Sequence, residues 1–360
     1  LNAGATGNNT AVGHIAGRLM TTGTGNTLVG AAAGDAITTG NSNTLLGIGA
    51  GGAESTGSNN VMVGIAGVAQ TLTSDTVAVG DGALLTNTKS AKNTAIGRSA
   101  LRNLNHTTAT DAYNTALGFN AGLSVTTGTS NNLIGGLAGD ALTTGSFNQV
   151  LGVSALSSDT QGSRAVAIGH GALLNQNFTT ATDVYNVAIG HNAGLSVTTG
   201  TQNTLIGGLA GDALTVGVQN VAIGTHALSS DTQGSLSVAI GRSALEAQNF
   251  TTATDAYNVA VGRHAGLSVT TGLENTLIGG LAGDALTDAD YNIVVGTSAL
   301  SADTLGSRSI AIGYKALEAQ NFTTATDTYN VAMGHFAGGS ITTGVNSTLI
   351  GGLAGDAITT

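Results

Sequence analysis

The chain is dominated by a short internal repeat that ends in glycine. The pattern Asn-Thr/Val-Ala/Leu-Ile/Val-Gly recurs along all 360 residues, and its glycine anchors the repeat. Successive anchors are spaced by 17, except for one spacing of 16 and four of 21, and from Gly97 onward the order 21, 17, 17, 17 gives a second period of 72. A short fixed period is typical of solenoids, in which each repeat forms one coil that stacks on its neighbours. The 20 anchors are Gly13, Gly30, Gly47, Gly64, Gly80, Gly97, Gly118, Gly135, Gly152, Gly169, Gly190, Gly207, Gly224, Gly241, Gly262, Gly279, Gly296, Gly313, Gly334 and Gly351.

The residues before each anchor predict a short strand that is apolar on both faces. The residue immediately before the anchor is Val, Ile, Leu or Met in all 20 copies, and we expect this row to be a core row. The residue two before the anchor is Ala, Leu, Val or Met in every copy. Because successive side chains of a strand point to opposite faces, one face fills the coil and the other needs a cover. A solvent-exposed apolar stripe of this length is unusual in a monomer, so we expect another chain to supply that cover.

Other repeat positions predict the turns and a hydrogen-bonded ladder. Asparagine lies four residues before the anchor in 15 of 20 copies, and alanine lies three residues after it in 19 of 20. Stacked asparagines can hydrogen-bond from coil to coil, and a second turn is marked by Thr-Thr-Gly or Asp-Thr-Gln-Gly. We therefore expect two short strands and two turns in each coil, and a rod of roughly 95 Å at about 4.8 Å per coil. We expect the structural ladder to include Asn93, Asn114, Asn131 and Asn148 together with Gly97, Gly118, Gly135 and Gly152.

The predicted fold class is all-β, a parallel β-solenoid of about 20 coils. Residues 1–96 form irregular N-terminal coils, and residues 97–360 form 72-residue super-repeats of the same continuous solenoid. Neither end shows the atypical capping repeat of a complete solenoid, so we expect the chain to be a segment of a longer protein.

The amino-acid composition limits the kinds of molecule that we expect the chain to bind. With no cysteine the chain has no disulfide and no thiolate metal site, so stability must come from burial and backbone hydrogen bonding. Its net charge is -10 with only 10 Lys and Arg residues, which argues against binding to nucleic acid or to an anionic membrane. We expect neither partner, and no direct insertion of this segment into a membrane.

Two copies of the repeat resemble a known family. Asn93-Thr-Ala-Ile-Gly97-Arg-Ser-Ala100 and Ser237-Val-Ala-Ile-Gly241-Arg-Ser-Ala244 are similar to the head repeats of trimeric autotransporter adhesins, whose signature is Ser-Val-Ala-Ile-Gly-x-x-Ala. Similar arrays occur in phage tail-fibre repeat proteins. The resemblance implies a left-handed β-roll, a homotrimer, and an extracellular location on a bacterial cell surface or a virion. The 17-residue coil and the regular 21-residue coils depart from the adhesin pattern.

The enlarged coils contain the most concentrated aromatic residues. Four-residue insertions in a solenoid map to loops on one side. Two interpretations stay open for these loops: contact with a host-surface glycan or protein receptor, or packing within the loop or between chains. The candidate receptor- or interface-contacting residues are His106, Tyr113, Phe178, Tyr185, Phe250, Tyr257, Phe322 and Tyr329.

Enzyme and metal chemistry are not expected. Gly135-Gly136-Leu-Ala-Gly139-Asp140 is superficially similar to calcium-binding nonapeptide repeats, which must recur at every ninth position. Its next copy ends at Asp212, a whole super-repeat later. Each candidate Ser, His or Asp sits at a repeated position, whereas a catalytic site needs one singular constellation. We therefore expect no enzyme activity, no cofactor and no metal.

The sequence favours a structural extracellular fibre segment, the shaft or head of a trimeric adhesin or of a phage tail fibre, which presents a tip. The alternative is an ice- or crystalline-surface-binding solenoid, suggested by the many Thr-Thr pairs. A lattice-matching face would need Thr-x-Thr on consecutive coils, which the repeat does not provide.

Overall fold

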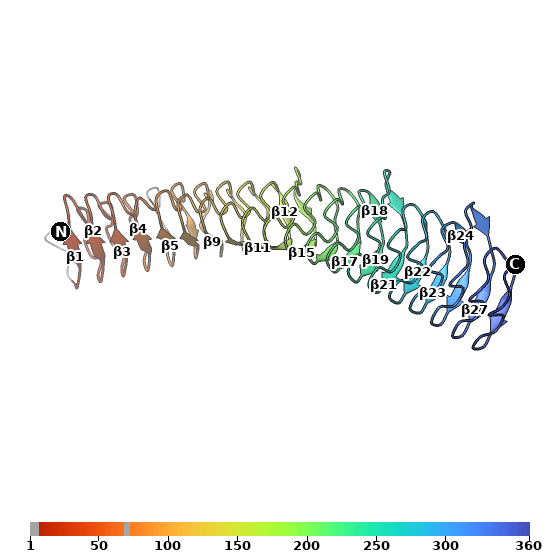
Figure 1. Cartoon of the computed structure of the whole chain (residues 1–360). Helices are drawn as coiled ribbons and strands as arrows, with labels where there is room; N and C mark the ends of the chain where they lie inside the picture. The colour runs from red at the N-terminus through yellow and green to blue at the C-terminus, as the bar shows by residue number, and fades with distance from the viewer. Residues whose placement is uncertain (1–6, 68–72) are drawn as a thin grey trace. The chain divides into compact units, whose positions relative to one another are not determined.

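The protein is an all-β parallel solenoid. The computed structural model describes residues 7–67 and 73–360, and the chain divides into two compact units, Leu1–Val184 and Tyr185–Thr360. In each unit successive coils stack so that one short strand per coil joins a parallel sheet (Figure 1). Within the described residues no helix is present, and hence none that is long and apolar enough to span a membrane.

Within its described residues, the first unit has ten three-residue strands in its main sheet and four two-residue strands outside it. The main strands are β1 (Thr10–Val12), β2 (Thr27–Val29), β3 (Thr44–Leu46), β4 (Val61–Val63), β5 (Val77–Val79), β7 (Thr94–Ile96), β9 (Thr115–Leu117), β10 (Asn132–Ile134), β11 (Gln149–Leu151) and β13 (Val166–Ile168). The short strands are β6 (Ser90–Ala91), β8 (Thr110–Asp111), β12 (Gly162–Ser163) and β14 (Thr182–Asp183).

The second unit repeats this plan. Its main strands are β15 (Val187–Ile189), β16 (Thr204–Ile206), β17 (Val221–Ile223), β19 (Val238–Ile240), β21 (Val259–Val261), β22 (Thr276–Ile278), β23 (Ile293–Val295), β25 (Ile310–Ile312), β27 (Val331–Met333) and β28 (Thr348–Ile350). The short strands are β18 (Gly234–Ser235), β20 (Thr254–Asp255), β24 (Gly306–Ser307) and β26 (Thr326–Asp327).

The strand register follows the spacing of the anchors. Equivalent residues pair in parallel, so Thr204 is opposite Val221 across an ordinary 17-residue coil. Val238 is opposite Val259 across an enlarged 21-residue coil. The predicted parallel solenoid of about 20 coils is thus confirmed.

The middle side chain of each main strand points into the coil, and the two flanking side chains point outward. Ala116 and Leu205 are fully buried, whereas Leu117 exposes 45 % of its surface. The row two residues before the anchors is the core row, so the prediction that the row immediately before them is the core row is wrong. Because both rows are aliphatic, their alternation could not show which one faces inward.

Most ordinary coils contain one strand instead of the predicted two; among the described residues the exceptions are the coils just before the enlarged ones, which contain β6, β12, β18 and β24. After the anchor the backbone enters a tight turn, in which Ala100 N–H donates to the Gly97 carbonyl (3.2 Å) and Ser99 has a positive φ of 58°. A positive φ at this position is typical of a type II turn. The next N–H, that of Leu101, donates to the Ala121 carbonyl of the following coil (3.0 Å). The coils therefore stay hydrogen-bonded to each other without a second strand, which is present only in each enlarged coil and in the coil before it.

The 72-residue period is also a packing unit of the core. From Gly80 onward the fourth residue after the anchor is Leu in two consecutive coils and Gly in the next two. A Cβ atom on Gly266 would lie 2.7 Å from Leu277 Cδ1 and 3.0 Å from Leu245 Cδ2. Leucines from the coils on either side thus fill the space beside this glycine, and the pattern repeats every four coils.

A ladder of buried asparagines links the coils. Asn131 donates its backbone N–H and Nδ2–H to Asn114 Oδ1 (3.0 and 3.2 Å), and Asn148 N–H donates to Asn131 Oδ1 (3.0 Å). Asn93 Oδ1 accepts the N–H of Asn114 (3.1 Å). Asn131 Nδ2 also donates to the Gly145 carbonyl (2.9 Å). Each asparagine therefore satisfies backbone groups of its own coil and of the neighbouring coil.

Candidate functional site

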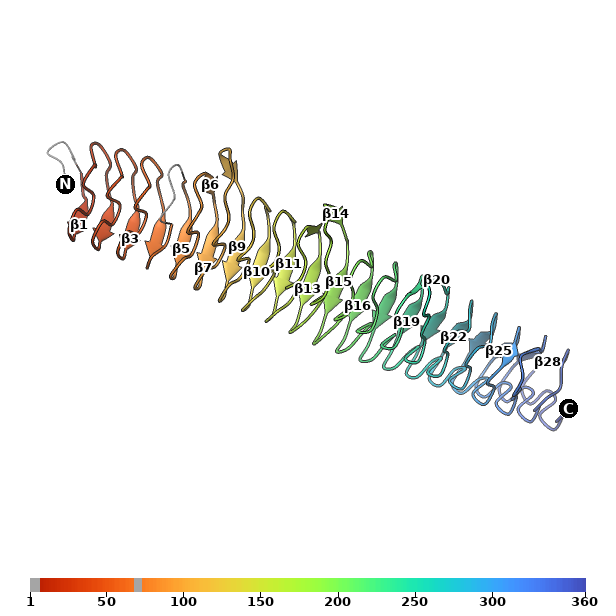
Figure 2. The same cartoon turned by 90° about the horizontal axis from the view of Figure 1, so that it is seen from above.

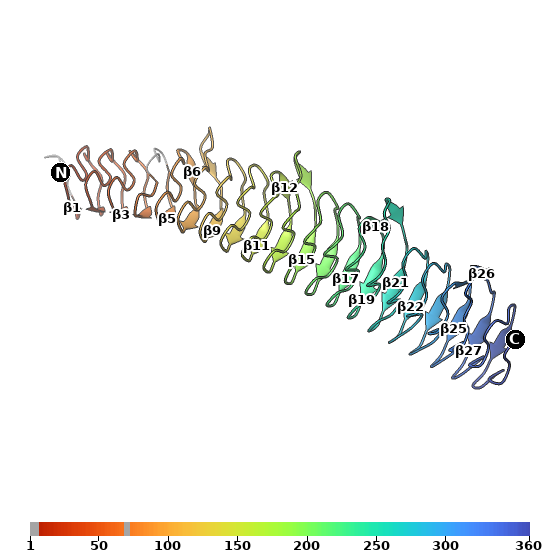
Figure 3. The same ribbon diagram turned by 45° about the horizontal axis from the view of Figure 1, so that its top comes forward.

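Each enlarged coil carries a short second strand that extends beyond its neighbours. The inserted segment pairs in parallel with the preceding coil, as β8 does with β6, β14 with β12, β20 with β18 and β26 with β24. Figure 2 shows β6, β14 and β20 at the rim of the coils. Figure 3 shows β6 and β12 in the first unit and β18 and β26 in the second at the same rim. The insertions thus form loops on one side of each unit.

A phenylalanine fills the interior of each of the three later loops. Phe250 exposes only 6 % of its surface, and Phe178 and Phe322 are buried to a similar degree. Their rings are therefore packed inside the protein and present little surface to a receptor. These three candidates fit the interpretation of packing within the loop.

A buried carboxylate supports each of these loops. Asp231 lies in the preceding coil and is fully buried. Its Oδ1 accepts the N–H of Gly234 (2.9 Å) and of Phe250 (3.2 Å), and its Oδ2 accepts Gln248 Nε2–H (2.6 Å). Asp159 and Asp303 make the equivalent bonds in the other two copies. This carboxylate fixes the turn and the start of the loop together.

The first loop lacks this support. Asn87 and Leu104 stand at the positions of Asp231 and Gln248, and His106 takes the place of the phenylalanine. His106 exposes only 8 % of its surface, and its Nε2 is buried with no hydrogen-bond partner. Burial lowers the pKa of its imidazole.

The tyrosines of the loops lie on the surface. Each is more than half exposed and lies five residues before an anchor, with a left-handed φ of 50° to 53°. This set contains the other four candidates: Tyr113, Tyr185, Tyr257 and Tyr329.

In the first unit one of these tyrosines belongs to a charged cluster, here called the N-terminal tyrosine cluster, of Lys92, Asp111 and Tyr113. Lys92 Nζ donates to Asp111 Oδ2 (2.6 Å) and to the Tyr113 hydroxyl (3.1 Å), and lies 5.2 Å from the centroid of the Tyr113 ring. The hydrogen bond to Asp111 raises the pKa of Lys92. The cluster holds one positive and one negative charge.

In the second unit the C-terminal tyrosine cluster consists of Tyr291, Arg308, Asp327 and Tyr329. Arg308 Nε lies 2.9 Å from Asp327 Oδ1, and Arg308 Cζ lies 4.7 Å from the centroid of the Tyr291 ring. The Tyr329 hydroxyl donates to Asp327 Oδ2 (3.4 Å). The hydrogen bond to Asp327 raises the pKa of Arg308.

The sequence analysis did not single out the cations of these clusters, nor the aromatic residues that lie one coil before such cations. Arg164 Cζ lies 4.9 Å from the centroid of the Phe147 ring, and Arg164 Nε lies 3.0 Å from Asp183 Oδ1. The signal that could have found them is the residue five positions before each anchor, a set of equivalent positions here called the column. In this column Lys92 and Arg308 are each followed, one coil later, by a tyrosine. The column becomes visible only when the coils are superposed.

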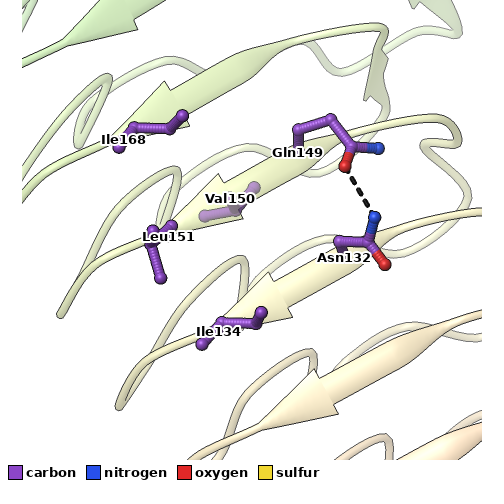
Figure 4. A pocket seen from close by; sticks show the side chains of 6 residues that line it. All are labelled: Asn132, Ile134, Gln149, Val150, Leu151 and Ile168. Atoms are coloured by element: carbon purple, nitrogen blue, oxygen red, sulfur yellow. Dashed lines mark hydrogen bonds between the residues drawn. The ribbon is translucent and has the colours of Figure 1, made fainter.

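The outward side chains of the main strands form a second candidate surface, here called the outer sheet face. In each unit it consists of the first and last residues of the described three-residue strands, none of which carries a charged side chain. An open groove of about 240 Å³ lies on this face in the first unit. In Figure 4, Ile134, Leu151 and Ile168 lie along one side of it, and Asn132 is hydrogen-bonded to Gln149 along the other. Leu151 exposes 48 % of its surface. An apolar face of this extent is typical of an interaction surface.

No metal centre is found in residues 7–67 and 73–360, where no group of three His, Cys, Asp or Glu side chains could hold an ion. Asp140, Asp212 and Asp284, from the glycine-rich motif, each bury one oxygen without a hydrogen-bond partner. Burial raises the pKa of all three carboxyls. They lie four coils apart, which is too far for two of them to ligate one ion.

Comparison with known proteins assigns no family. No model of a known protein family matches the chain, and no curated protein sequence matches it.

Proposed function

We propose that the chain is a structural segment of an extracellular fibre in which identical chains pack along their outer sheet faces. The observation that carries this proposal is the uncharged outer sheet face, in which the row immediately before the anchors is Val, Ile, Leu or Met in every strand. Leu117 and Leu151 expose nearly half of their surface, and apolar area buried against a partner contributes about 25 cal/mol per Å².

A second copy of the same chain is the partner that this face fits best. Each row of apolar side chains on this face has one residue per coil, and neighbouring residues of a row are about one strand spacing, 4.8 Å, apart. A copy aligned in parallel presents rows with the same spacing, so contacts repeat at every coil without a change of register. The resemblance to trimeric adhesin heads favours three chains.

The role that we propose is mechanical. Hydrogen bonds between coils contribute about 1 kcal/mol each, and the asparagine ladder adds buried bonds from side-chain oxygens of one coil to backbone N–H groups of the next. Such a segment, on a bacterial surface or a phage tail, would hold a tip away from its base as shaft or head. The resemblance supports this setting.

Binding to ice is less well supported. Thr143 Oγ1 donates to the Thr160 carbonyl of the next coil (2.7 Å), and Thr126 Oγ1 donates to the Thr143 carbonyl (3.3 Å). These hydroxyls already satisfy the protein backbone, so they are not free to match a lattice. A clear thermal hysteresis of the purified chain would favour this alternative.

Sedimentation analysis tests the fibre proposal. We expect a particle three times the 35.0 kDa chain mass. The triple variant Ile189→Asn, Ile206→Asn, Ile223→Asn places polar groups on three adjacent strands of the outer sheet face. It should dissociate at concentrations at which the unaltered protein stays associated.

The matched control places asparagine in the same coils but away from this face. Gln202→Asn with Gln219→Asn changes two residues that lie five positions before an anchor. Both have a left-handed backbone conformation, which asparagine tolerates. This variant should keep the mass of the unaltered protein. An unaltered chain that stays monomeric at all concentrations contradicts the proposal.

A further inference from the structure

The exposed tyrosines occupy a backbone position that does not favour them. In ordinary coils this position also has a positive φ and holds residues of several kinds, from Asn59 and Ser130 to the aromatic Tyr291. Bulky side chains are rare in the left-handed region, which costs roughly 1 kcal/mol or more, whereas asparagine enters it more easily. Tyr257 exposes 53 % of its surface, so burial does not offset this cost. A tyrosine here contributes little to the core.

The repeat also shows which parts of the clusters are constant. Tyrosine occurs in all four enlarged coils, and Asp111, Asp183, Asp255 and Asp327 lie two residues before it in every copy. The residue one coil earlier varies, because Leu236 stands where the other copies have Lys92, Arg164 or Arg308. The tyrosine and aspartate pair is therefore the shared element.

The chemistry of the clusters matches a neutral sugar. An exposed aromatic ring offers an apolar face to the C–H face of a pyranose ring. Nearby carboxylate and cationic groups can exchange hydrogen bonds with its hydroxyls. Arg308 is already paired with Asp327, and Lys92 with Asp111. An anionic ligand would find no unpaired cation in either cluster, and the net charge of -10 would repel it.

We propose that the tyrosine-bearing rim of the enlarged coils binds a neutral polysaccharide. This inference rests on the proposed extracellular fibre and names the class of its surface ligand. In the second unit Tyr257 and Tyr329 are four coils apart, roughly 19 Å at the usual strand spacing. A polysaccharide that contacts both gains from the high effective concentration of the second site. Binding therefore strengthens with chain length.

Affinity electrophoresis tests the proposal with defined probes: gels that contain dextran, galactomannan or xyloglucan, and a gel with hyaluronate as the anionic comparison. We expect retardation of the full chain by at least one neutral polysaccharide and none by hyaluronate. Changing Tyr113, Tyr185, Tyr257 and Tyr329 to Asn should weaken the retardation at least tenfold. Asparagine suits the left-handed backbone, so this variant should stay folded.

The control is Tyr314→Ala, which removes an exposed aromatic residue stacked on His335 (5.3 Å between ring centroids) away from the loops. It should bind like the unaltered protein. The proposal is overturned if none of the three neutral gels retards the chain, if the fourfold variant binds equally well, or if hyaluronate binds as strongly.

Sedimentation of the same samples separates the two proposals. A trimer that binds none of the neutral polysaccharides overturns only the sugar site. A monomer that binds through its tyrosines overturns the oligomeric fibre but supports the site.

Discussion

At the scale of single residues, the glycine anchors are fixed by backbone geometry. Gly135 has a φ of 132°, and a Cβ atom placed on it would collide with the carbonyl oxygen of Gly152 in the next coil. The adjacent Gly136 has neither constraint, because a Cβ atom on it would meet nothing within 4 Å. Of these two residues, only the anchor Gly135 needs to be glycine for steric reasons.

This contrast gives a paired prediction. Gly135→Ala should lower the free energy of unfolding by about 2 kcal/mol or more, since it combines a strained φ with a steric clash. Gly136→Ala should leave it unchanged or raise it by about 0.5 kcal/mol through the lower entropy of the unfolded chain. Denaturant unfolding of both variants checks the difference. Equal effects would contradict the geometry.

His106 predicts a pH-dependent first loop. Its pKa is lowered in the fold, so the neutral form is favoured there, while an opened loop titrates near the ordinary value of 6.5. Stability is fully present above pH 6.5 and is lost as the pH falls below it, because the opened loop takes up the proton first. Hydrogen exchange of residues 103–113, corrected for intrinsic rates, should show more frequent opening at pH 5 than at pH 7.5.

Two comparisons control for this effect. The loop at residues 249–257 has Phe250 at the equivalent position and should show no such dependence. His106→Phe should remove the dependence and stabilise the loop by about 1 kcal/mol, because no buried nitrogen is left without a partner. The same pH response in both loops would argue against a role for His106.

At the scale of elements, the enlarged coil is a loop held by a buried polar cluster. Asp231 joins the turn at Gly234 to Phe250 and Gln248 through three hydrogen bonds. The carboxylate is stable there because donors surround it, although burial of an unpaired charge would be costly.

Removing this carboxylate should open the loop while the solenoid persists. Asp231→Ala removes the acceptor of the Gly234 and Phe250 backbone N–H groups, each at a cost of roughly 1 to 3 kcal/mol, and leaves the Gln248 amide with Ser237 Oγ as its remaining acceptor. Hydrogen exchange should therefore increase in residues 249–257. The control Asp255→Ala changes an exposed aspartate of the same loop and should have little effect. Unchanged exchange in Asp231→Ala would mean that β18 and β20 hold the loop without it.

At the scale of the whole molecule, the 72-residue period determines which deletions the fold tolerates. Each coil contacts mainly its neighbours, so stability is close to a sum over coils and their interfaces. The alternation of Leu and Gly in the core has the same four-coil period as the loops. A deletion of one full period joins surfaces that already match.

We therefore expect a variant without residues 208–279 to fold. It joins Gly207 to Gly280, which is equivalent to Gly208, and so keeps both the register and the packing pattern. Deleting residues 208–275 instead stops four residues short of the full period, so it breaks the register and should give an unfolded or aggregated protein. Circular dichroism and thermal melting distinguish the two, and equal behaviour would show that the period has no structural role.

The sequence by itself determined the coils, their number, their parallel stacking and the positions of the enlarged loops, because each follows from the spacing of the glycine anchors. The tertiary structure decided which aliphatic row is the core, since two apolar rows leave strand alternation uninformative. In most coils it also replaced the expected second strand with turns, because left-handed residues such as Ser99 are not obvious from their side chains. Within the loops it placed the phenylalanines inside and the tyrosines outside, and in the first loop it placed Lys92 of the coil before beside Tyr113. That separation depends on contacts between coils, which residue spacing alone does not reveal.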